Sequence, residues 1–307
     1  MGEHGGASGR CAGAPPPGDP EGRMSTADAP RYTPEWLRLR EDADAAARAQ
    51  DLLGPLRRRL ADRPQRSTGL VIRDLGCGTG SMGRWLIARL DGPQHWLLHD
   101  RDPDLLRRAA ALTPRTAADG SRVTVATEPG DITRVTAADL AGTSLVTASA
   151  LLDLLTGDEV EGLAEACAGA GCPALLALSV VGRVEFTPGD PLDAALRDAF
   201  NAHQRRSDGG RRLLGPDAVT AASEAFMRRG ATVLVRPSPW RLGSGESTLT
   251  AEWLRGWVGA ACEQRPELSV RADAYLTRRL AACAAGELQV VVGHSDLLAL
   301  PGPAGGA

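Results

Sequence analysis

The residues with the clearest chemical potential are three glycines at alternate positions, Gly76, Gly78 and Gly80, which follow Asp74. Glycine adopts positive φ readily and, having no Cβ, lets a ligand lie against the main chain. A short apolar run precedes Asp74, and apolar residues at helical spacing occupy 85–90. This pattern predicts a strand, a tight turn and a helix start. The free N–H groups of a helix start suit a polar or anionic group, and the acidic residue suits an ammonium group.

Residues 74–80, Asp-Leu-Gly-Cys-Gly-Thr-Gly, resemble motif I of the class I S-adenosylmethionine (SAM) dependent methyltransferases. In that family the glycine turn packs against the methionine part of SAM, and the acidic residue orients its amino end. The resemblance therefore implies that SAM is the cofactor. It also implies a first group of cofactor-binding residues: Asp74, Gly76, Cys77, Gly78 and Gly80.

Residues 78–83 also fit G-x-G-x-x-G, the dinucleotide fingerprint, so an NAD(P)-dependent oxidoreductase is the alternative function. The acidic prefix at Asp74, the helical segment before the first strand and the later acidic positions favour SAM. A further alternative is a catalytically inactive SAM-fold protein that binds a ligand or regulates a partner, because intact binding motifs say nothing about turnover.

The composition excludes several kinds of chemistry. The chain has 307 residues, 43% of them hydrophobic, and a net charge of −3. All 35 basic residues are arginine, which excludes a Schiff-base lysine and a P-loop lysine. With no basic stripe or aromatic platform, we expect a small-molecule methyl acceptor and no nucleic acid partner.

The six cysteines form no C-x-x-C pair, and the five histidines do not cluster with them, so we expect no metal. Scattered cysteines without a secretion signal favour a cytoplasmic protein. No apolar run approaches the roughly 18 residues of a membrane span, so no membrane association is expected.

Strands alternating with helices predict an α/β protein. The resemblance implies a Rossmann-like sheet of seven mostly parallel strands with helices on both faces. A continuous apolar run at 174–181 is typical of a central parallel strand. The hydrophobic segment 288–300 fits the family's last strand, which is antiparallel and lies between strands five and six.

The sequence predicts an ordered succession of segments. They are a disordered tail at 1–28, in which Met24 is a possible true start, a helical segment at 29–66, a SAM-binding domain at 67–300 and a loose tail at 301–307. The helical segment is expected over 33–62 with a bend near Gly54–Pro55. It either covers the active site, as in the family, or packs on the sheet.

Asp100 ends the next expected strand, 95–99, twenty residues after Gly80. A carboxylate there can accept hydrogen bonds from both ribose hydroxyls. The alternative is a helix cap, for which Asp102 is the better candidate. Arg101 is a further candidate cofactor contact.

Two later positions complete the predicted cofactor site. Asp131 and Ile132 follow the expected strand 122–126 and resemble the family's adenine-binding motif, although Gly-Asp is also an ordinary turn. Ser149 lies in the expected strand 144–150, where the family's main chain meets SAM.

The substrate-side candidates come after these motifs. We expect residues 182–215, which follow strand five, to form a substrate-covering insertion. His203 could act as a base or be an exposed helix-end residue. The substrate-binding candidates are Asp153, Glu185, Arg205 and Trp240, and for Asp153 a helix cap is an equal alternative. Sequence patterns do not specify the acceptor, the methylated atom or the oligomeric state.

Overall fold

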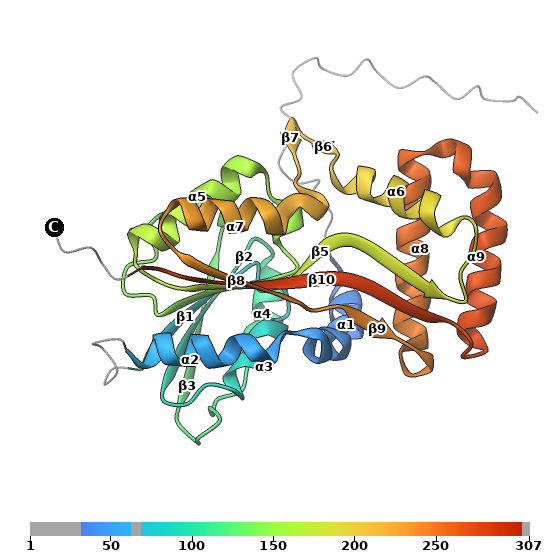
Figure 1. Ribbon diagram of the computed structural model, residues 1–307. Coiled ribbons are helices and arrows are strands. Elements are labelled where there is room, and N and C mark those ends of the chain that lie inside the picture. The colour runs from blue at the N-terminus through green and yellow to red at the C-terminus, as the bar shows by residue number, and fades with distance from the viewer. Residues whose placement is uncertain (1–31, 63–68, 303–307) are drawn as a thin grey trace, which may run out of the picture. The chain divides into compact units, whose positions relative to one another are not determined.

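An eight-stranded sheet, mostly parallel, runs through the centre of the chain (Figure 1). The computed structural model describes residues 32–62 and 69–302. The predicted N-terminal tail, 1–28, and most of the predicted C-terminal tail, 303–307, lie outside these ranges. Within the described ranges, no helix combines the length and the apolar character needed to cross a membrane.

The strand order is β3-β2-β1-β4-β5-β10-β8, with β10 antiparallel to both of its neighbours and β9 paired to β10. This confirms the α/β fold and the predicted place of the last strand between strands five and six. The eighth strand is the short β9, which was not expected. The strands are β1 (Leu70–Leu75), β2 (Gln94–Asp100), β3 (Val123–Pro129), β4 (Leu145–Ser149), β5 (Ala174–Thr187), β8 (Thr232–Pro237), β9 (Trp240–Leu242) and β10 (Gln289–Leu300).

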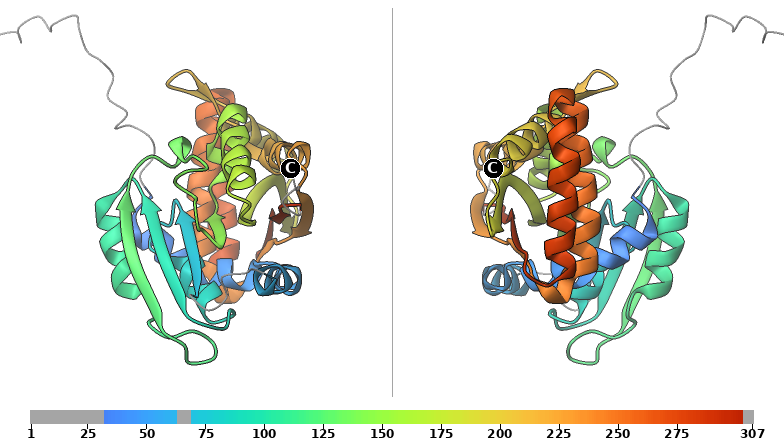
Figure 2. Two further views of the ribbon diagram at one scale, coloured as in Figure 1. Left: turned by 90° about the vertical axis from the view of Figure 1, so that its left-hand side faces the viewer. Right: turned by 90° about the vertical axis from the view of Figure 1, so that its right-hand side faces the viewer.

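Helices cover both faces of this sheet (Figures 1 and 2). The second, third and fourth helices pack on one face, and the fifth and seventh pack on the other. The helices are α1 (Pro34–Ala47), α2 (Leu53–Ala61), α3 (Ser81–Ile87), α4 (Pro103–Leu112), α5 (Gly157–Gly169), α6 (Asp193–Gln204), α7 (Ala218–Arg228), α8 (Ser247–Gln264) and α9 (Ser269–Ala284).

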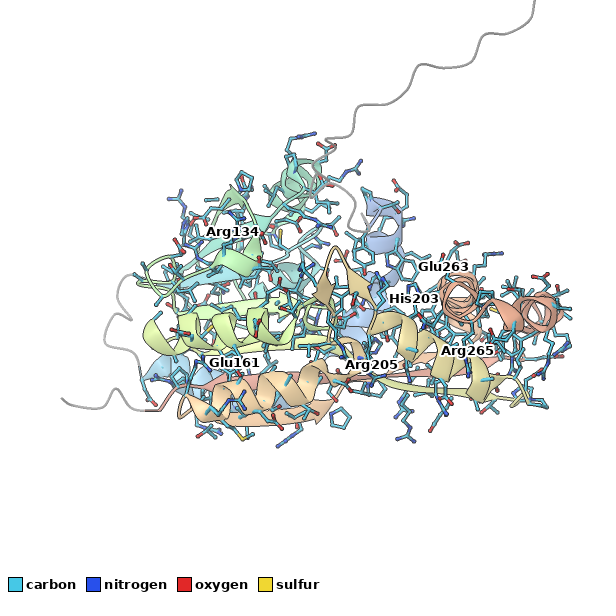
Figure 3. All side chains as sticks on the ribbon, turned by 90° about the horizontal axis from the view of Figure 1, so that it is seen from above. Arg134, Glu161, His203, Arg205, Glu263 and Arg265 are labelled. Atoms are coloured by element: carbon cyan, nitrogen blue, oxygen red, sulfur yellow. The ribbon has the colours of Figure 1, made fainter. Side chains whose placement is uncertain are left out.

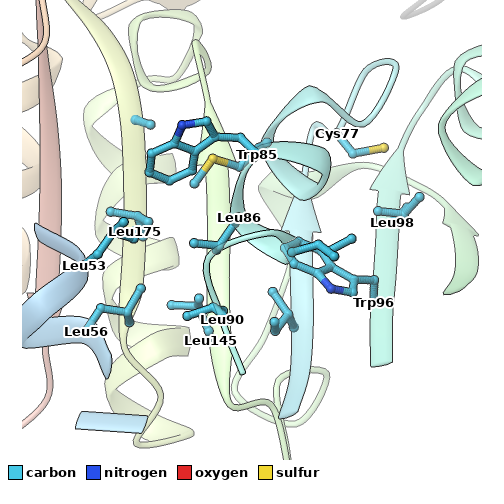
Figure 4. Close-up of a cluster of buried hydrophobic side chains, with 14 of the residues drawn as sticks. Leu53, Leu56, Cys77, Trp85, Leu86, Leu90, Trp96, Leu98, Leu145 and Leu175 are labelled. Atoms are coloured by element: carbon cyan, nitrogen blue, oxygen red, sulfur yellow. The ribbon is translucent and has the colours of Figure 1, made fainter. Parts of the chain in front are cut away.

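The apolar core on the α2–α4 face surrounds the helix that follows the glycine turn (Figure 4). Leu86 of α3 and Trp96 of β2 are completely buried there. Burying a large apolar side chain contributes about 1.5–3 kcal/mol. This packing holds α3, and with it the glycine turn, rigidly against the sheet.

Strand β5 is longer than the sequence predicted. It was expected to end near Val181, but it continues to Thr187 because β10 pairs with the added segment, with Val291 opposite Glu185. The extension passes into a second helical layer formed by α6, α8 and α9 (Figure 1). There Trp253 and Trp257 are buried and stack with ring centroids 5.4 Å apart.

The N-terminal helical segment breaks at a different place from the one expected. Gly54 and Pro55 lie in the first turns of α2, where a missing proline N–H costs little. The break between α1 and α2 lies at Arg48 and Ala49, and a single 3₁₀ turn (Gln50–Leu52) follows it. The Ala49 N–H leaves the helix ladder and donates to Asp296 of β10 at 2.8 Å. A contact distant in sequence thus determines the break.

The start of α5 carries a reciprocal capping pair. Thr156 Oγ1 accepts the Glu159 N–H at 3.2 Å, and Glu159 Oε2 accepts the Thr156 N–H at 2.9 Å. We expect Thr156→Ala to lower the free energy of unfolding by about 1 kcal/mol, measured by chemical denaturation. Ser223→Ala is the control, because the Ser223 hydroxyl donates to the Val219 carbonyl within α7 and caps no helix start. Equal effects of the two substitutions would contradict the capping role.

Candidate cofactor site

The glycine turn connects β1 to α3 at the carboxyl end of the parallel strands. Gly76, Gly78 and Gly80 have φ values of 61°, 55° and 84°, which non-glycine residues rarely adopt. A Cβ at Gly78 would lie 3.2 Å from Leu37 Cδ1 of α1. The N-terminal helix therefore lies directly over the turn. Cys77 is buried, and burial raises the pKa of its thiol, so it is not a thiolate.

Asp74 is completely buried at the end of β1. Its Oδ1 accepts the Thr147 hydroxyl at 2.7 Å, while no described residue bonds its Oδ2. Burial raises the pKa of this carboxyl to about 7, although the positive charges of Arg48 and Arg84 oppose the shift. A buried carboxylate oxygen without a partner is unfavourable unless a ligand supplies the donor.

Arg48 is the binding candidate that sequence reasoning missed. It caps the end of α1 and is 2% exposed. Its Nη2 donates to Ser81 Oγ at 3.2 Å and to Ser149 Oγ at 3.3 Å. Its Nε and Nη1 have no hydrogen-bond partner among the described residues. The available signal was an arginine isolated among alanines, 45–49, which by itself indicates only a helix.

Together, Asp74 and Arg48 present opposite charges beside the glycine turn. Burial lowers the pKa of Arg48, and the charges of Asp44, Asp296 and Asp74 oppose that shift. The Arg48 charge in turn opposes the rise in the pKa of Asp74, so Asp74 and Arg48 are close enough to interact. Each keeps buried polar atoms without a partner in the described part of the chain. A carboxylate acceptor beside a guanidinium donor complements a zwitterion, with an ammonium toward Asp74 and a carboxylate toward Arg48.

Asp100, at the end of β2, stabilises the glycine turn through hydrogen bonds. Its Oδ2 accepts the Gly78 N–H at 2.9 Å, and its Oδ1 accepts the Asp102 N–H at 3.0 Å. Asp102, rather than Asp100, caps α4 by accepting the Leu105 and Asp104 N–H groups. Each Asp100 oxygen retains a second lone pair, so the carboxylate can still accept hydroxyl donors.

Asp131 and Ile132 lie beside Asp100, because Pro129 of β3 is opposite Asp100 and the Gly130 N–H donates to the Asp100 carbonyl at 3.1 Å. Asp131 caps a 3₁₀ turn by accepting the N–H and hydroxyl of Thr133. Asp131 therefore lies in an ordinary turn, as the alternative interpretation of Gly-Asp expected. The adenine contact of Asp131 and Ile132 stays a prediction. Arg101 follows Asp100 and is exposed.

Asp153 lies in the 3₁₀ turn Leu152–Leu154 after β4 and is half-buried. Burial raises the pKa of its carboxyl, against the positive charges of Arg40 and Arg206. Tyr32, at the start of the described chain, interacts electrostatically with Asp153 and the same two arginines. Segments before α1, after β4 and after α6 therefore converge near the cofactor site.

The other four substrate-side candidates each contact another protein group. His203 Nδ1 lies 3.9 Å from Glu263 Oε2 of α8, and Arg205 holds Asp217 through two bonds of 2.6 and 2.7 Å (Figure 3). Glu185 pairs with its neighbour Arg183 on the β5 extension. The indole of Trp240 is 2% exposed and donates to Asp44 at 2.9 Å. Burial lowers the pKa of His203, as does Arg206.

These contacts do not test the roles expected of the four residues, which stay predictions. Three of these side chains interact with a residue distant in sequence, and the fourth, Glu185, pairs within the extension of β5. In the described residues, no three His, Cys, Asp or Glu side chains gather as a metal site.

Neither family models nor curated proteins match this chain. Among solved structures, it is similar to a SAM-dependent methyltransferase from Thiobacillus denitrificans in complex with S-adenosyl-L-homocysteine. The two are 14% identical, and the match covers 88% of this chain and 99% of that chain, with a TM-score of 0.44. The cyclopropane synthase MmaA2 from Mycobacterium tuberculosis is also 14% identical, over 87% of this chain and 94% of that chain, with a TM-score of 0.43.

Proposed function

We propose that the chain is a SAM-dependent methyltransferase that acts on a small-molecule acceptor. The observation that supports this most strongly is the buried pair beside the glycine turn. Asp74 Oδ2 and Arg48 Nε and Nη1 lack partners among the described residues, and the amino acid end of SAM supplies the missing ammonium and carboxylate. The residues present therefore fit the cofactor.

The positions of three further groups around the glycine turn suggest the remaining contacts with the cofactor. Asp100 would accept the ribose hydroxyls, Asp131 and Ile132 would meet the adenine, and the glycine turn would pack against the methionine part of SAM. When bound, SAM supplies an electrophilic methyl group on a sulfonium. The protein's contribution would be to orient the acceptor in line with that methyl and to exclude water.

On the acceptor side, Asp153 is the carboxylate within the converging segments, and it would hold or deprotonate a nucleophile. Burial holds the pKa of Asp153 above its ordinary value, which suits proton transfer closer to neutrality. A base is needed only for an acceptor that must lose a proton. His203, against α8, would serve only if the α6–α8 contact opened.

The direct test is calorimetric titration with SAM and, separately, NADH, followed by a screen of small-molecule acceptors with methyl-labelled SAM. Micromolar binding of SAM and label transfer would support the proposal. Binding of NADH without SAM would favour the oxidoreductase alternative. Binding of SAM without transfer to any acceptor would favour the inactive binding protein.

SAM affinity should depend on pH through Asp74. Only the ionised carboxylate attracts the ammonium, and its pKa is about 7. Titration at pH 6 and pH 8 should therefore show affinity rising about tenfold, with little change above pH 8. Asp74→Asn should flatten the profile. A wild-type profile that is flat over this range would contradict the role of Asp74.

Ionisation of Asp74 affects the stability of the ligand-free fold in the opposite direction to its effect on SAM affinity. The pKa of Asp74 is raised in the folded state, from an ordinary value of 3.8 to about 7. Its contribution to stability is therefore fully present below pH 3.8 and is lost as the pH rises toward 7. Ligand-free protein should gain less stability between pH 4 and 7 than the Asp74→Asn variant.

A further inference from the structure

One buried carboxylate outside the cofactor site connects three distant parts of the chain. Asp296, in β10, is 2% exposed. Its Oδ1 accepts the Leu178 N–H of β5 at 2.8 Å, and its Oδ2 accepts the Ala49 N–H at 2.8 Å. Hydrogen bonds to a charged acceptor are stronger than those between neutral groups. Asp296 thus holds the N-terminal segment to the sheet at the residue after Arg48.

The same contacts include two strained residues. Leu178 and Ala150 have φ values of 57° and 53° although neither is glycine. Such conformations are unfavourable for residues with a Cβ and persist only where the surroundings hold them. Asp296 bonds the N–H of Leu178, and the preceding carbonyl, that of Ala177, accepts the Ala150 N–H at 2.9 Å. The strain is therefore concentrated next to Ser149, at the cofactor side of β4.

These hydrogen bonds form a closed loop of contacts that begins and ends at Arg48. Arg48 donates to Ser149, and Ser149 precedes the strained Ala150. Ala150 is bonded to β5, and β5 is bonded through Asp296 to Ala49, which is covalently joined to Arg48. Both the backbone and the side chain of Arg48 are thereby fixed. The Arg48 N–H makes the last hydrogen bond of α1, to the Asp44 carbonyl at 3.1 Å, and the ψ of 133° at Arg48 then turns the chain out of the helix toward Ala49.

We propose that Asp296 is a positioning residue that aims the Arg48 guanidinium at the carboxylate of the SAM amino acid end. This inference rests on the function proposed above. Without the Asp296 carboxylate, the Ala49 N–H loses its acceptor in a buried place, and the break between α1 and α2 can rearrange. The guanidinium then leaves its position between Ser81 and Ser149, while the ribose and adenine contacts at Asp100 and Asp131 are untouched.

The test compares two ligands on each variant by calorimetry. SAM has the amino acid end, and 5′-methylthioadenosine has the nucleoside and sulfur without it. For Asp296→Ala we expect SAM affinity to fall at least about tenfold, as loss of a charge-assisted contact implies, while methylthioadenosine affinity stays within about twofold. Asp296→Asn keeps one acceptor oxygen and should give a smaller loss.

Two controls separate positioning from general damage. Asp193 of α6 is a mostly buried carboxylate bonded to Arg279 and Tyr275 in the other helical layer, so Asp193→Asn should lower stability without changing the ratio of the two affinities. Arg48→Ala combined with Asp296→Ala should bind SAM no more weakly than Arg48→Ala alone, because both act through one group.

If Asp296→Ala lost affinity for both ligands equally, or lost no affinity for SAM, the positioning role would be wrong while the proposed function would remain. Failure of the wild-type protein to bind SAM would overturn both. Additive losses in the double variant would show that Asp296 does not act through Arg48.

Discussion

Replacing Arg48 by alanine is expected to weaken SAM binding about a hundredfold and to leave 5′-methylthioadenosine binding nearly unchanged. The guanidinium is buried, and two of its three nitrogens lack a partner in the described chain. A bound carboxylate would complete these bonds in a site without competing water, where charged hydrogen bonds are worth about 1.5–3 kcal/mol. Calorimetric titration of both ligands measures the difference.

The same substitution should also lower the free energy of unfolding of the ligand-free protein. It removes the bonds from Arg48 to Ser81 and Ser149 and takes from the buried Asp74 an opposite charge that interacts with it. Arg57→Ala is the matched control, since Arg57 is on the same N-terminal segment but is exposed and donates to the Arg89 carbonyl. Equal loss of both ligands in Arg48→Ala would instead indicate that α1 had detached from the site.

Replacing Asp100 by alanine is expected to weaken SAM and 5′-methylthioadenosine alike, by about a hundredfold. Two effects combine: the ribose loses its acceptor, and the Gly78 and Asp102 N–H groups lose theirs. A buried donor left without an acceptor costs about 1–3 kcal/mol, so the free energy of unfolding should also fall. Titration of both ligands and denaturant unfolding measure the two effects.

Asp102→Ala supplies the control for Asp100. It removes the cap of α4, about 1 kcal/mol, from the same chain segment. Because Asp102 does not touch the glycine turn, its replacement should change the affinities less than about threefold. If Asp100→Ala and Asp102→Ala had the same effect on binding, the ribose and turn-bracing roles of Asp100 would be wrong.

Several parts of the site followed from local sequence. The glycines at 76, 78 and 80 take the positive φ values that their type suggested, because a tight turn between a buried strand and a helix leaves few other conformations. Asp100 ends β2 at the predicted residue, because an apolar run that stops at an acid is a local signal. The alternation of strands and helices predicted the α/β fold, and the resemblance to a methyltransferase family predicted the antiparallel last strand.

Other parts depended on contacts that no local pattern contains. The extension of β5 to Thr187 exists because β10 pairs with it, and the buried state of Trp240 depends on Asp44 of α1. Arg205 is a substrate-binding candidate in the sequence, and in the folded chain its guanidinium is paired with Asp217, just before α7. In each case the partner is set by how distant elements pack.

The sequence by itself therefore determined the conformation of the glycine turn, the acidic residues at the strand ends and the class of fold, because each depends on backbone preferences and apolar spacing over a few residues. Only the tertiary structure brought Arg48 to the turn and placed Asp296 behind it. Arg48 lies in a stretch whose composition indicates only a helix, and the helix ends there because a carboxylate in the last strand accepts the Ala49 N–H. A buried charge gains its role from the partners that surround it, and these come together only when the whole sheet has formed.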